Sequence, residues 1–524
     1  MIISFNTGKI ESGGGSSTLQ DKRVVIMENG LDVVVPDAGY DGLGTVYVKT
    51  YVTDTTGKKD FSTIGYDEEL NIKLNEEIDE KLAYSKSLYD KQKDNMKGNK
   101  ANLFLNDNVL YYAPALDTSQ TTDASSFFKN CGNLKIVPYY DWSNCKTLNN
   151  MFYSNKGVEE LDLSSWDVSN VSDIKNMFYN CSNLVSLNIT GWDISNITHL
   201  GGLFTKCSNL IELVGLKNWD VSNVTVLDNV FQGCASLKSL DLSSWDVSKT
   251  NSANYLFSDT SGLTYLNLDG WNLTSLTSLS YSPFGNAGST DGELILTNAK
   301  LPNLSAYGDL FKTLNFKYVD FTGTEFYATN FANCFYQSKV QEIRGFKIST
   351  KPTTLKQMFY GCSKLTDVDF VDLDTSECTD FAQMFYNCIN LTEAPSISLK
   401  SMPSTTINSS SKIYQLFYSC GNIKTFGGFY DCEHITNWGG NNSANPFYNT
   451  AKLENITGFG TIKGTDFSIN ISTLTVDSIM VLLNALYDYS EEGGTHTIKI
   501  GSTNLAKLTD EQKAVATSKG WLLS

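Results

Sequence analysis

Residues 161–187 read LDLSSWDVSNVSDIKNMFYNCSNLVSL, and this stretch predicts the fold of most of the chain. It opens with residues 161–164, where apolar and polar side chains alternate as in a short strand with one buried face. A Trp166-Asp167 turn follows, and the stretch closes on an aromatic turn around Phe178, then Cys181 and a Leu-x-x-Leu pair. The same order of strand, turn, aromatic and cysteine returns along the chain, which indicates a repeat protein.

The aromatic turn gives the period of the repeat. Its second apolar residue serves as a marker that occurs 13 times, at Phe128, Phe152, Phe178, Phe204, Phe231, Phe257, Phe284, Phe311, Phe335, Phe359, Phe385, Phe417 and Phe447. Successive markers lie 24 to 32 residues apart, and Phe284 and Phe311 match the pattern least well. This is the period of leucine-rich repeats. One such unit cannot bury its apolar face alone, so we expect stacked coils that share one core.

This pattern resembles the BspA-type leucine-rich repeats, which occur in bacterial surface proteins and in phages of gut bacteria. The resemblance covers about residues 115–460. It implies an α/β-type leucine-rich-repeat solenoid of about 13 coils, built mainly of short strands with turns and short helices. The chain looks most like fibre and virion proteins of gut bacteriophages, including crAss-like phages that infect Bacteroides.

Two short segments open the chain. Residues 1–17 hold a terminal peptide and a Gly/Ser linker, and the peptide is either a docking segment or a free tail. Residues 18–60 predict a small β module, because Asn29-Gly30 between two strand-like runs is a hairpin signal. The module resembles N-terminal modules of fibre-like virion proteins. We expect it to anchor the chain to a particle, with candidate contacts at Phe5, Val33, Tyr40 and Tyr47.

Residues 61–114 predict a helix and a connector. The helix is expected over about 67–95, where four apolar residues are spaced four apart and charges fill the other faces, at Leu70, Leu74, Ile78 and Leu82. It is either an oligomerising stalk or a helix packed on the first repeat. The pattern is not a sustained heptad, so it cannot set an oligomer number.

The repeats are expected over residues 115–465, and residues 466–524 break the pattern. Apolar residues from Thr475 to Leu486 have helical spacing, and residues 495–500 alternate like a strand. Residues 509–512 form a capping box that opens a second helix, which ends near Gly520. This region predicts the α+β cap that shields the last coil of a solenoid.

Composition excludes several classes of function. The chain has 524 residues and a formal net charge of -17, so binding of nucleic acid by the whole surface is disfavoured. No apolar stretch approaches the roughly 20 residues that span a bilayer, so membrane insertion is not expected. The N-terminus does not read as a secretory signal peptide, which predicts a chain made in a host cytoplasm.

Catalytic and metal-binding patterns are not evident. The three histidines, His199, His434 and His496, lie far apart in sequence. Seven of the 11 cysteines follow the marker Phe by three residues, which predicts a ladder of buried thiols that act as small apolar fillers. No local Cys-x-x-Cys pair favours zinc. We therefore expect no enzyme activity, no cofactor and no bound metal.

The repeated Trp-Asp-Val-Ser-Asn turns have two interpretations. Asp, Ser and Asn suit turn capping, although they could also supply oxygen ligands to calcium. The tryptophans either pack between coils or are exposed to a ligand, and as candidate ligand contacts they are Trp166, Trp192, Trp219 and Trp245.

These features predict a structural and recognition protein of a bacteriophage virion, a fibre or decoration of head or tail. Its N-terminus would bind other virion proteins, and the solenoid would face outward to bind a host-surface glycan or protein by multivalent contacts. A homo-oligomer, with a trimer favoured, fits the stalk interpretation. The alternative is an adhesin on a bacterial cell surface, and a remote alternative is a glycan-degrading spike enzyme.

Overall fold

A computed structural model describes most of the chain from residue 80 onward, and four short strands before it. The described residues are 4–5, 22–26, 31–36, 47–50, 80–81, 83–277, 281–302, 304–308, 310–403, 406–407, 412–438, 445–464, 466–469 and 471–524. They divide into two compact units. Unit 1 comprises Met1–Lys238 with Ser244–Asp246, and unit 2 comprises Ser239–Ser243 with Val247–Ser524.

The four N-terminal strands form an antiparallel sheet in the order β1-β2-β3-β4. Their bounds are β1 Ser4–Phe5, β2 Lys22–Ile26, β3 Leu31–Pro36 and β4 Tyr47–Thr50. Strands β2 and β3 pair in the register Ile26↔Asp32, so the hairpin predicted around Asn29-Gly30 is confirmed by its two flanking strands. The Gly/Ser linker and Tyr40 lie outside the described residues.

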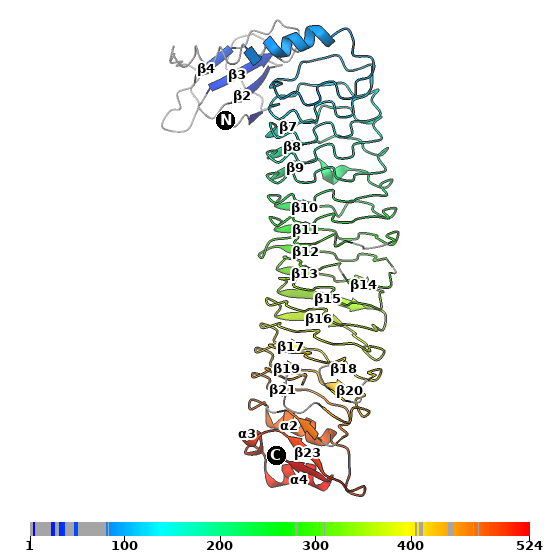
Figure 1. Cartoon of the computed structure of the whole chain (residues 1–524), viewed down its shortest axis with the longest axis vertical. Helices are drawn as coiled ribbons and strands as arrows, with labels where there is room; N and C mark the ends of the chain where they lie inside the picture. Colours follow the sequence, from blue (N-terminus) through cyan, green and yellow to red (C-terminus); the bar gives the residue numbers. More distant parts are fainter. Residues whose placement is uncertain are drawn as a thin grey trace, which may run out of the picture. The chain divides into compact units, whose positions relative to one another are not determined.

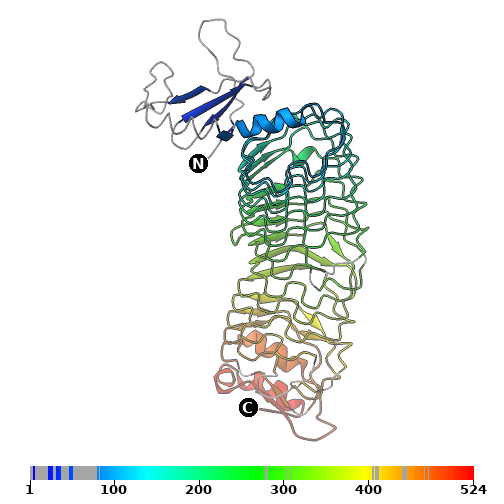
Figure 2. The same cartoon turned by 45° about the horizontal axis from the view of Figure 1, so that its top comes forward.

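Helical residues 83–92 precede the first coil of unit 1. The Tyr84 hydroxyl donates to Oδ2 of Asp107 at 2.8 Å, and Nζ of Lys81 lies 4.0 Å from the Tyr111 ring centroid. Figure 2 shows this helix beside the first coils. The described part of the helix therefore packs on the repeats, whereas Leu70, Leu74, Ile78 and Leu82, on which the stalk interpretation depends, lie outside the described residues.

The short strands in the coils of unit 1 form two parallel ladders, β5-β6 and β7-β8-β9. The strands are β5 Gly98–Asn99, β6 Thr121–Asp123, β7 Glu160–Asp162, β8 Ser186–Asn188 and β9 Glu212–Val214, followed by the short helix η1 Leu216–Asn218. Leu161 pairs with Leu187 in register, and both side chains are buried. Strand alternation therefore turns the leucines inward, as the sequence predicts.

Unit 2 continues the same design. Its main sheet runs β10-β11-β12-β13-β15-β14, and β16 also pairs with β15 (Figure 1). These strands are β10 Ser239–Asp241, β11 Tyr265–Asn267, β12 Glu293–Ile295, β13 Tyr318–Asp320, β14 Glu325–Phe326, β15 Glu342–Ile348 and β16 Asp367–Val371. Two smaller parallel ladders follow, made of β17 Glu393–Ala394, β18 Ile397–Ser398, β19 Thr425–Phe426, β20 Phe429–Tyr430 and β21 Asn455–Ile456.

The C-terminal cap has α and β elements, as predicted. Its parallel sheet β22-β23-β24 comprises Asp466–Ser468, His496–Lys499 and Trp521–Leu523. The helices are α2 Val476–Ala485, α3 Ser502–Leu505 and α4 Asp510–Ser518. The capping box of Thr509 and Gln512 is formed at the start of α4, which confirms that prediction.

The marker phenylalanines form stacked columns within each unit. Phe152 and Phe178 are 5.6 Å apart between centroids, and the two weakest assignments, Phe284 and Phe311, stack at 5.5 Å. The column of unit 1 starts one coil earlier than predicted, because Phe104 stacks on Phe128 at 5.5 Å. Counted over the described residues of both units, the repeats make about 16 coils rather than the expected 13. Phe104 was not predicted as a marker, because Asp107 occupies the position at which other coils have a cysteine.

Two residues of the aromatic turn, four positions apart, adopt a left-handed backbone. In the coil of Phe152, φ is 53° at Asn150 and 56° at Ser154. The amides of Asn150, Phe152 and Ser154 point to the next coil and donate to its carbonyls at 2.9, 2.8 and 2.7 Å. Because asparagine tolerates this conformation better than other residues with a Cβ, the turn is rich in Asn.

Candidate recognition surface

The four tryptophans of the Trp-Asp turns lie inside the coils. Trp166, Trp192, Trp219 and Trp245 are only 3–4% exposed. The indole Nε1 of Trp192 donates to the carbonyl of Leu163 in the preceding coil at 2.9 Å. Trp219 and Trp245 stack with centroids 6.2 Å apart. These four tryptophans therefore pack between coils, and their indoles are not part of an outer face.

The polar residues of the same turns hold the backbone. Oδ1 of Asp167 accepts from the amide and hydroxyl of Ser169 at 3.0 and 2.7 Å, and these bonds lower the pKa of the Asp167 carboxyl. Nδ2 of Asn170 donates to the carbonyl of Ser143, one coil earlier, at 2.8 Å. Each Asp thus caps its turn and each Asn joins two coils. Within the described ranges, no group of three or more His, Cys, Asp or Glu side chains is arranged to hold a metal ion.

The predicted thiol ladder is confirmed, with one addition. All 11 cysteines are buried and free. The thiol of Cys181 donates to the carbonyl of Phe152, and Cys207 donates to Phe178, both at 3.0 Å. The acceptor is each time the marker Phe of the preceding coil. These cysteines are therefore hydrogen-bond donors between coils as well as apolar fillers, and burial raises the pKa of Cys234 to about 12.

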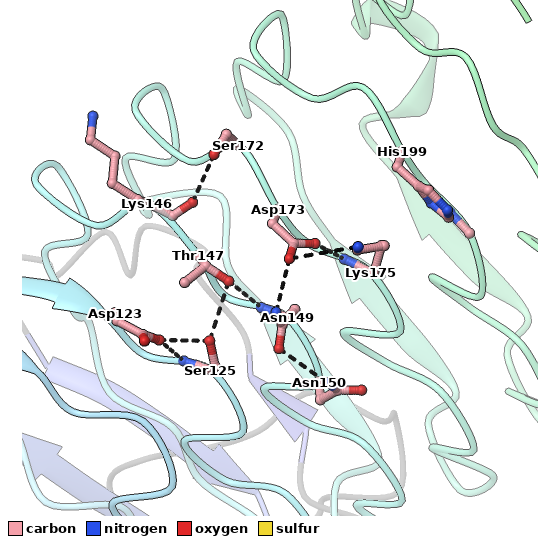
Figure 3. Close-up of polar contacts among 11 residues, drawn as sticks. Asp123, Ser125, Lys146, Thr147, Asn149, Asn150, Ser172, Asp173, Lys175 and His199 are labelled. Atoms are coloured by element: carbon pink, nitrogen blue, oxygen red, sulfur yellow. Dashed lines mark hydrogen bonds and ion pairs between the residues drawn. The ribbon is translucent and has the colours of Figure 1, made fainter.

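A row of polar side chains crosses successive coils of unit 1 (Figure 3). Asp123, Thr147 and Asp173 follow one another through parallel bridges. Oδ1 of Asp123 accepts from the amide of Ser125 at 2.9 Å, and Oδ2 of Asp173 accepts from Nδ2 of Asn149 at 2.8 Å. The row caps turns and joins coils.

His199 occupies the repeat position of Asp173 in the next coil. Its Nδ1 accepts from the amide of Gly201 at 2.9 Å, and burial, together with Lys175, lowers its pKa. Elsewhere, Nδ1 of His496 lies 2.7 Å from the carbonyl oxygen of Gly464 in the C-terminal cap. Both histidines have local structural partners.

Three of the four candidate anchoring residues are found in the N-terminal sheet. Phe5 belongs to β1, Val33 to β3 and Tyr47 to β4. Residue Val33 pairs with Val25 on one side and with Val48 on the other, so its strand is central.

A row of tyrosines runs along unit 2, directly after the marker Phe of successive coils. We call it the tyrosine row, and it comprises Tyr336, Tyr360, Tyr386, Tyr418 and Tyr448. The rings stack in parallel, with centroids 5.0, 4.7, 4.9 and 5.6 Å apart. All five side chains are half-buried. Burial, together with the neighbouring phenols of Tyr386 and Tyr336, raises the pKa of Tyr360.

An amide row accompanies the tyrosine row, two residues before the marker. Nε2 of Gln357 donates to Oε1 of Gln383 at 2.8 Å, and Nε2 of Gln383 donates to Oε1 of Gln415 at 2.9 Å. At one end of the tyrosine row, Nζ of Lys312 lies 5.9 Å from the Tyr336 ring centroid. These rows were not predicted from the sequence, because the aromatic turn was interpreted mainly as part of the core. The signal was a tyrosine at the same repeat position in neighbouring coils.

The coils, their columns of buried side chains and their exposed rows define a repeat solenoid of the leucine-rich type. Residues 104–187, 181–295 and 327–456 match the family model described as "Mycoplasma protein of unknown function, DUF285". Because these stretches make up more than half of the chain, the protein belongs to this family. The match fits a BspA-like repeat protein, and no curated protein sequence matches the chain. No helix among the described residues has the length and apolar character to cross a membrane.

Proposed function

We propose that the protein is a structural and recognition component of a bacteriophage virion. Its N-terminal region would bind other virion proteins, and its repeats would bind a glycan or protein on the host surface. The membership of a repeat-solenoid family fits a recognition or adhesion role. The observation that carries the recognition part of the proposal is the tyrosine row, in which one type of half-exposed side chain recurs on successive coils.

Repetition gives such a surface its affinity. Each coil offers a weak contact, and contacts on several coils engage one extended or multivalent ligand with a gain in avidity. The proposal includes a homo-oligomer, with a trimer favoured, which would multiply the contacts again. It includes no catalytic step and no cofactor.

Deletion of the N-terminal region tests the anchoring. We expect a chain lacking residues 1–52 to be absent from purified particles while its repeats keep their circular dichroism spectrum. Normal incorporation of this deletion variant would remove the anchoring claim. Mass determination of the full chain at micromolar concentration tests the oligomer, and a monomer would contradict it.

A bacterial cell-surface adhesin is the second candidate, favoured by the family description, which names a mycoplasmal protein. Immunogold labelling with antibodies against the repeats separates the two. Gold on phage particles supports the virion role, and gold on intact cells in the absence of particles supports the adhesin.

A further inference from the structure

The tyrosine and amide rows of unit 2 form one strip, and we propose that this strip binds an uncharged polysaccharide chain that lies across successive coils. The inference rests on the proposed recognition function and assigns its site and ligand class. Three properties of the strip support the inference: the spacing of its tyrosine rings, the amide row beside them and the neutral character of its side chains.

The spacing of the row leaves ring edges rather than ring faces for a ligand. Tyr360 and Tyr386 are 4.7 Å apart with an interplanar angle of 2°, so each ring covers the face of the next. A half-buried ring in such a stack presents its edge and its hydroxyl to solvent. The row therefore offers phenol groups at intervals of about one coil, each of which can donate and accept a hydrogen bond.

The amide row lies beside the tyrosine row. The equivalent positions in unit 1 indicate this arrangement, because a Cβ atom at Gly202 would lie 3.1 Å from Cγ of Asn176 and 3.7 Å from Cδ2 of Tyr179. Gly202 and Asn176 have the repeat position that Gln357, Gln383 and Gln415 have in unit 2. Each glutamine amide has two hydrogens and two lone pairs, and the bonds between neighbouring glutamines use one of each at Gln383. Gln357 and Gln383 are only partly buried, so the remaining donors and acceptors are within reach of solvent.

The tyrosine and glutamine side chains of the strip are neutral and none is aliphatic, and the Nζ of Lys312 lies at its end, near Tyr336. The residues that follow the five tyrosines are also polar or small, at Gln337, Gly361, Asn387, Ser419 and Asn449. In a chain with 19% charged residues and a net charge of -17, such a neutral strip stands apart from the average surface. The nearest charged neighbours in sequence include Lys339 and Lys356, and both side chains are exposed.

This chemistry suits a neutral polyhydroxyl chain better than other polymers. A protein partner is typically bound through apolar, aromatic and Arg side chains in the interface core. Of these the strip has aromatic rings alone, and their faces are covered by the neighbouring rings. An anionic polymer needs several cationic contacts along its length. Sugar hydroxyls both donate and accept, as do the phenols and amides of the strip.

Affinity electrophoresis of the full chain tests the inference. The chain migrates through native gels that contain dextran, mannan or hydroxyethyl cellulose as neutral probes, and alginate as an anionic probe. We expect at least one neutral polysaccharide to retard it and alginate not to do so. The triple variant Y360F/Y386F/Y418F keeps the stacked rings and removes three hydroxyls, so we expect binding about tenfold weaker or more.

The matched control is Y153F/Y179F, which removes two hydroxyls from the stacked tyrosine pair of unit 1. We expect this variant to be retarded like the unmodified chain, and both variants to keep its melting temperature. The inference is overturned if no neutral probe retards the chain, if alginate retards it more strongly, or if the triple variant binds as well as the unmodified chain.

The outcome also separates the inference from the proposed function. If the labelled chain attaches to host cells equally well with the substitutions Y360F/Y386F/Y418F and in the presence of neutral polysaccharide, this result contradicts the inference but not the proposed function. A second result would also overturn the inference. If the triple variant does not attach and protease treatment of the cells abolishes attachment of the unmodified chain, the strip binds a protein ligand. Retardation by a neutral probe without attachment to cells or particles contradicts the proposed function alone.

Discussion

At the scale of single residues, the tryptophans of the repeat differ in one hydrogen bond. The indoles of Trp192 and Trp245 donate to carbonyls of the preceding coil. Within the described part of the chain, the buried indole nitrogens of Trp142, Trp219 and Trp438 have no hydrogen-bond partner. A buried N–H without a partner costs roughly 1–3 kcal/mol, so the same residue type contributes unequally in different coils.

This difference gives a matched pair of substitutions. We expect Trp192→Phe to lower the free energy of unfolding by about 1 kcal/mol more than Trp219→Phe, because only the first removes an indole hydrogen bond. Both indoles are buried in unit 1, so the loss of volume is similar. Urea denaturation followed by circular dichroism measures the difference. Equal losses in the two variants would contradict the assignment.

His199 makes the stability of its turn depend on pH. Its imidazole accepts a hydrogen bond from the Gly201 amide, and its pKa is lowered in the folded chain. Protonation removes that acceptor. A histidine whose folded pKa lies below the unfolded value of about 6.5 stabilises the fold above that pH, and the contribution is lost as the pH falls through the folded pKa.

We therefore expect the melting temperature of the unmodified chain to fall more between pH 7 and pH 5 than that of His199→Asn. Asparagine is a fair replacement because Oδ1 of Asn330 accepts from the Ala332 amide at 2.9 Å in the equivalent turn of unit 2. Melting curves of both proteins at the two pH values make the comparison. Identical pH dependence would show that His199 does not titrate as proposed.

At the scale of elements, no strand of the coils is stable alone. Most have only two or three residues, far fewer than an isolated hairpin needs. Their stability comes from neighbours in the stack, which is why side-chain columns such as Phe152 on Phe178 run through successive coils of a unit. The helices of the cap are different, because α2 and α4 carry their own N-terminal capping residues.

The capping box of α4 is the clearest of these signals. The hydroxyl oxygen of Thr509 accepts from the Gln512 amide at 3.2 Å, and the Gln512 side chain accepts from the Thr509 amide at 2.9 Å. We expect Thr509→Ala to destabilise the cap by about 1 kcal/mol. Thr517→Ala, near the end of the same helix, is the control and should have less effect. Hydrogen exchange of the α4 amides reports the change, and equal effects would contradict the prediction.

At the scale of the whole chain, the cysteines report on the integrity of both units. Five lie in unit 1 and six in unit 2, and all are buried. Burial raises the pKa of Cys131, Cys234 and Cys378 to about 12, so at neutral pH these thiols are protonated and poorly nucleophilic.

We expect no thiol of the native chain to react with Ellman's reagent at pH 8, and all 11 to react after denaturation. Mass spectrometry of alkylated peptides identifies the residues. Rapid labelling of any one cysteine in the native protein would show that its coil opens locally. We likewise expect the cysteines of the native chain to resist oxidation.

The chain alone is enough to predict the repeat, because its signals are local. The period follows from Phe, Cys and Leu at constant spacing, and the Asn-rich turn reflects a backbone conformation that few residues tolerate. The capping box of Thr509 is equally local. The coil of Phe104 was not predicted, because Asp107 stands where other coils have a cysteine.

Only the tertiary structure decided which aromatic residues face inward. Trp166 and Tyr360 both belong to a repeated turn, yet the first is buried between coils and the second stands at a half-exposed edge. Likewise, the bond from Cys181 joins residues 29 apart in the chain. The physical reason is that the direction of a side chain in a coil is set by contacts with the coils above and below, and those neighbours lie a full repeat away in the sequence.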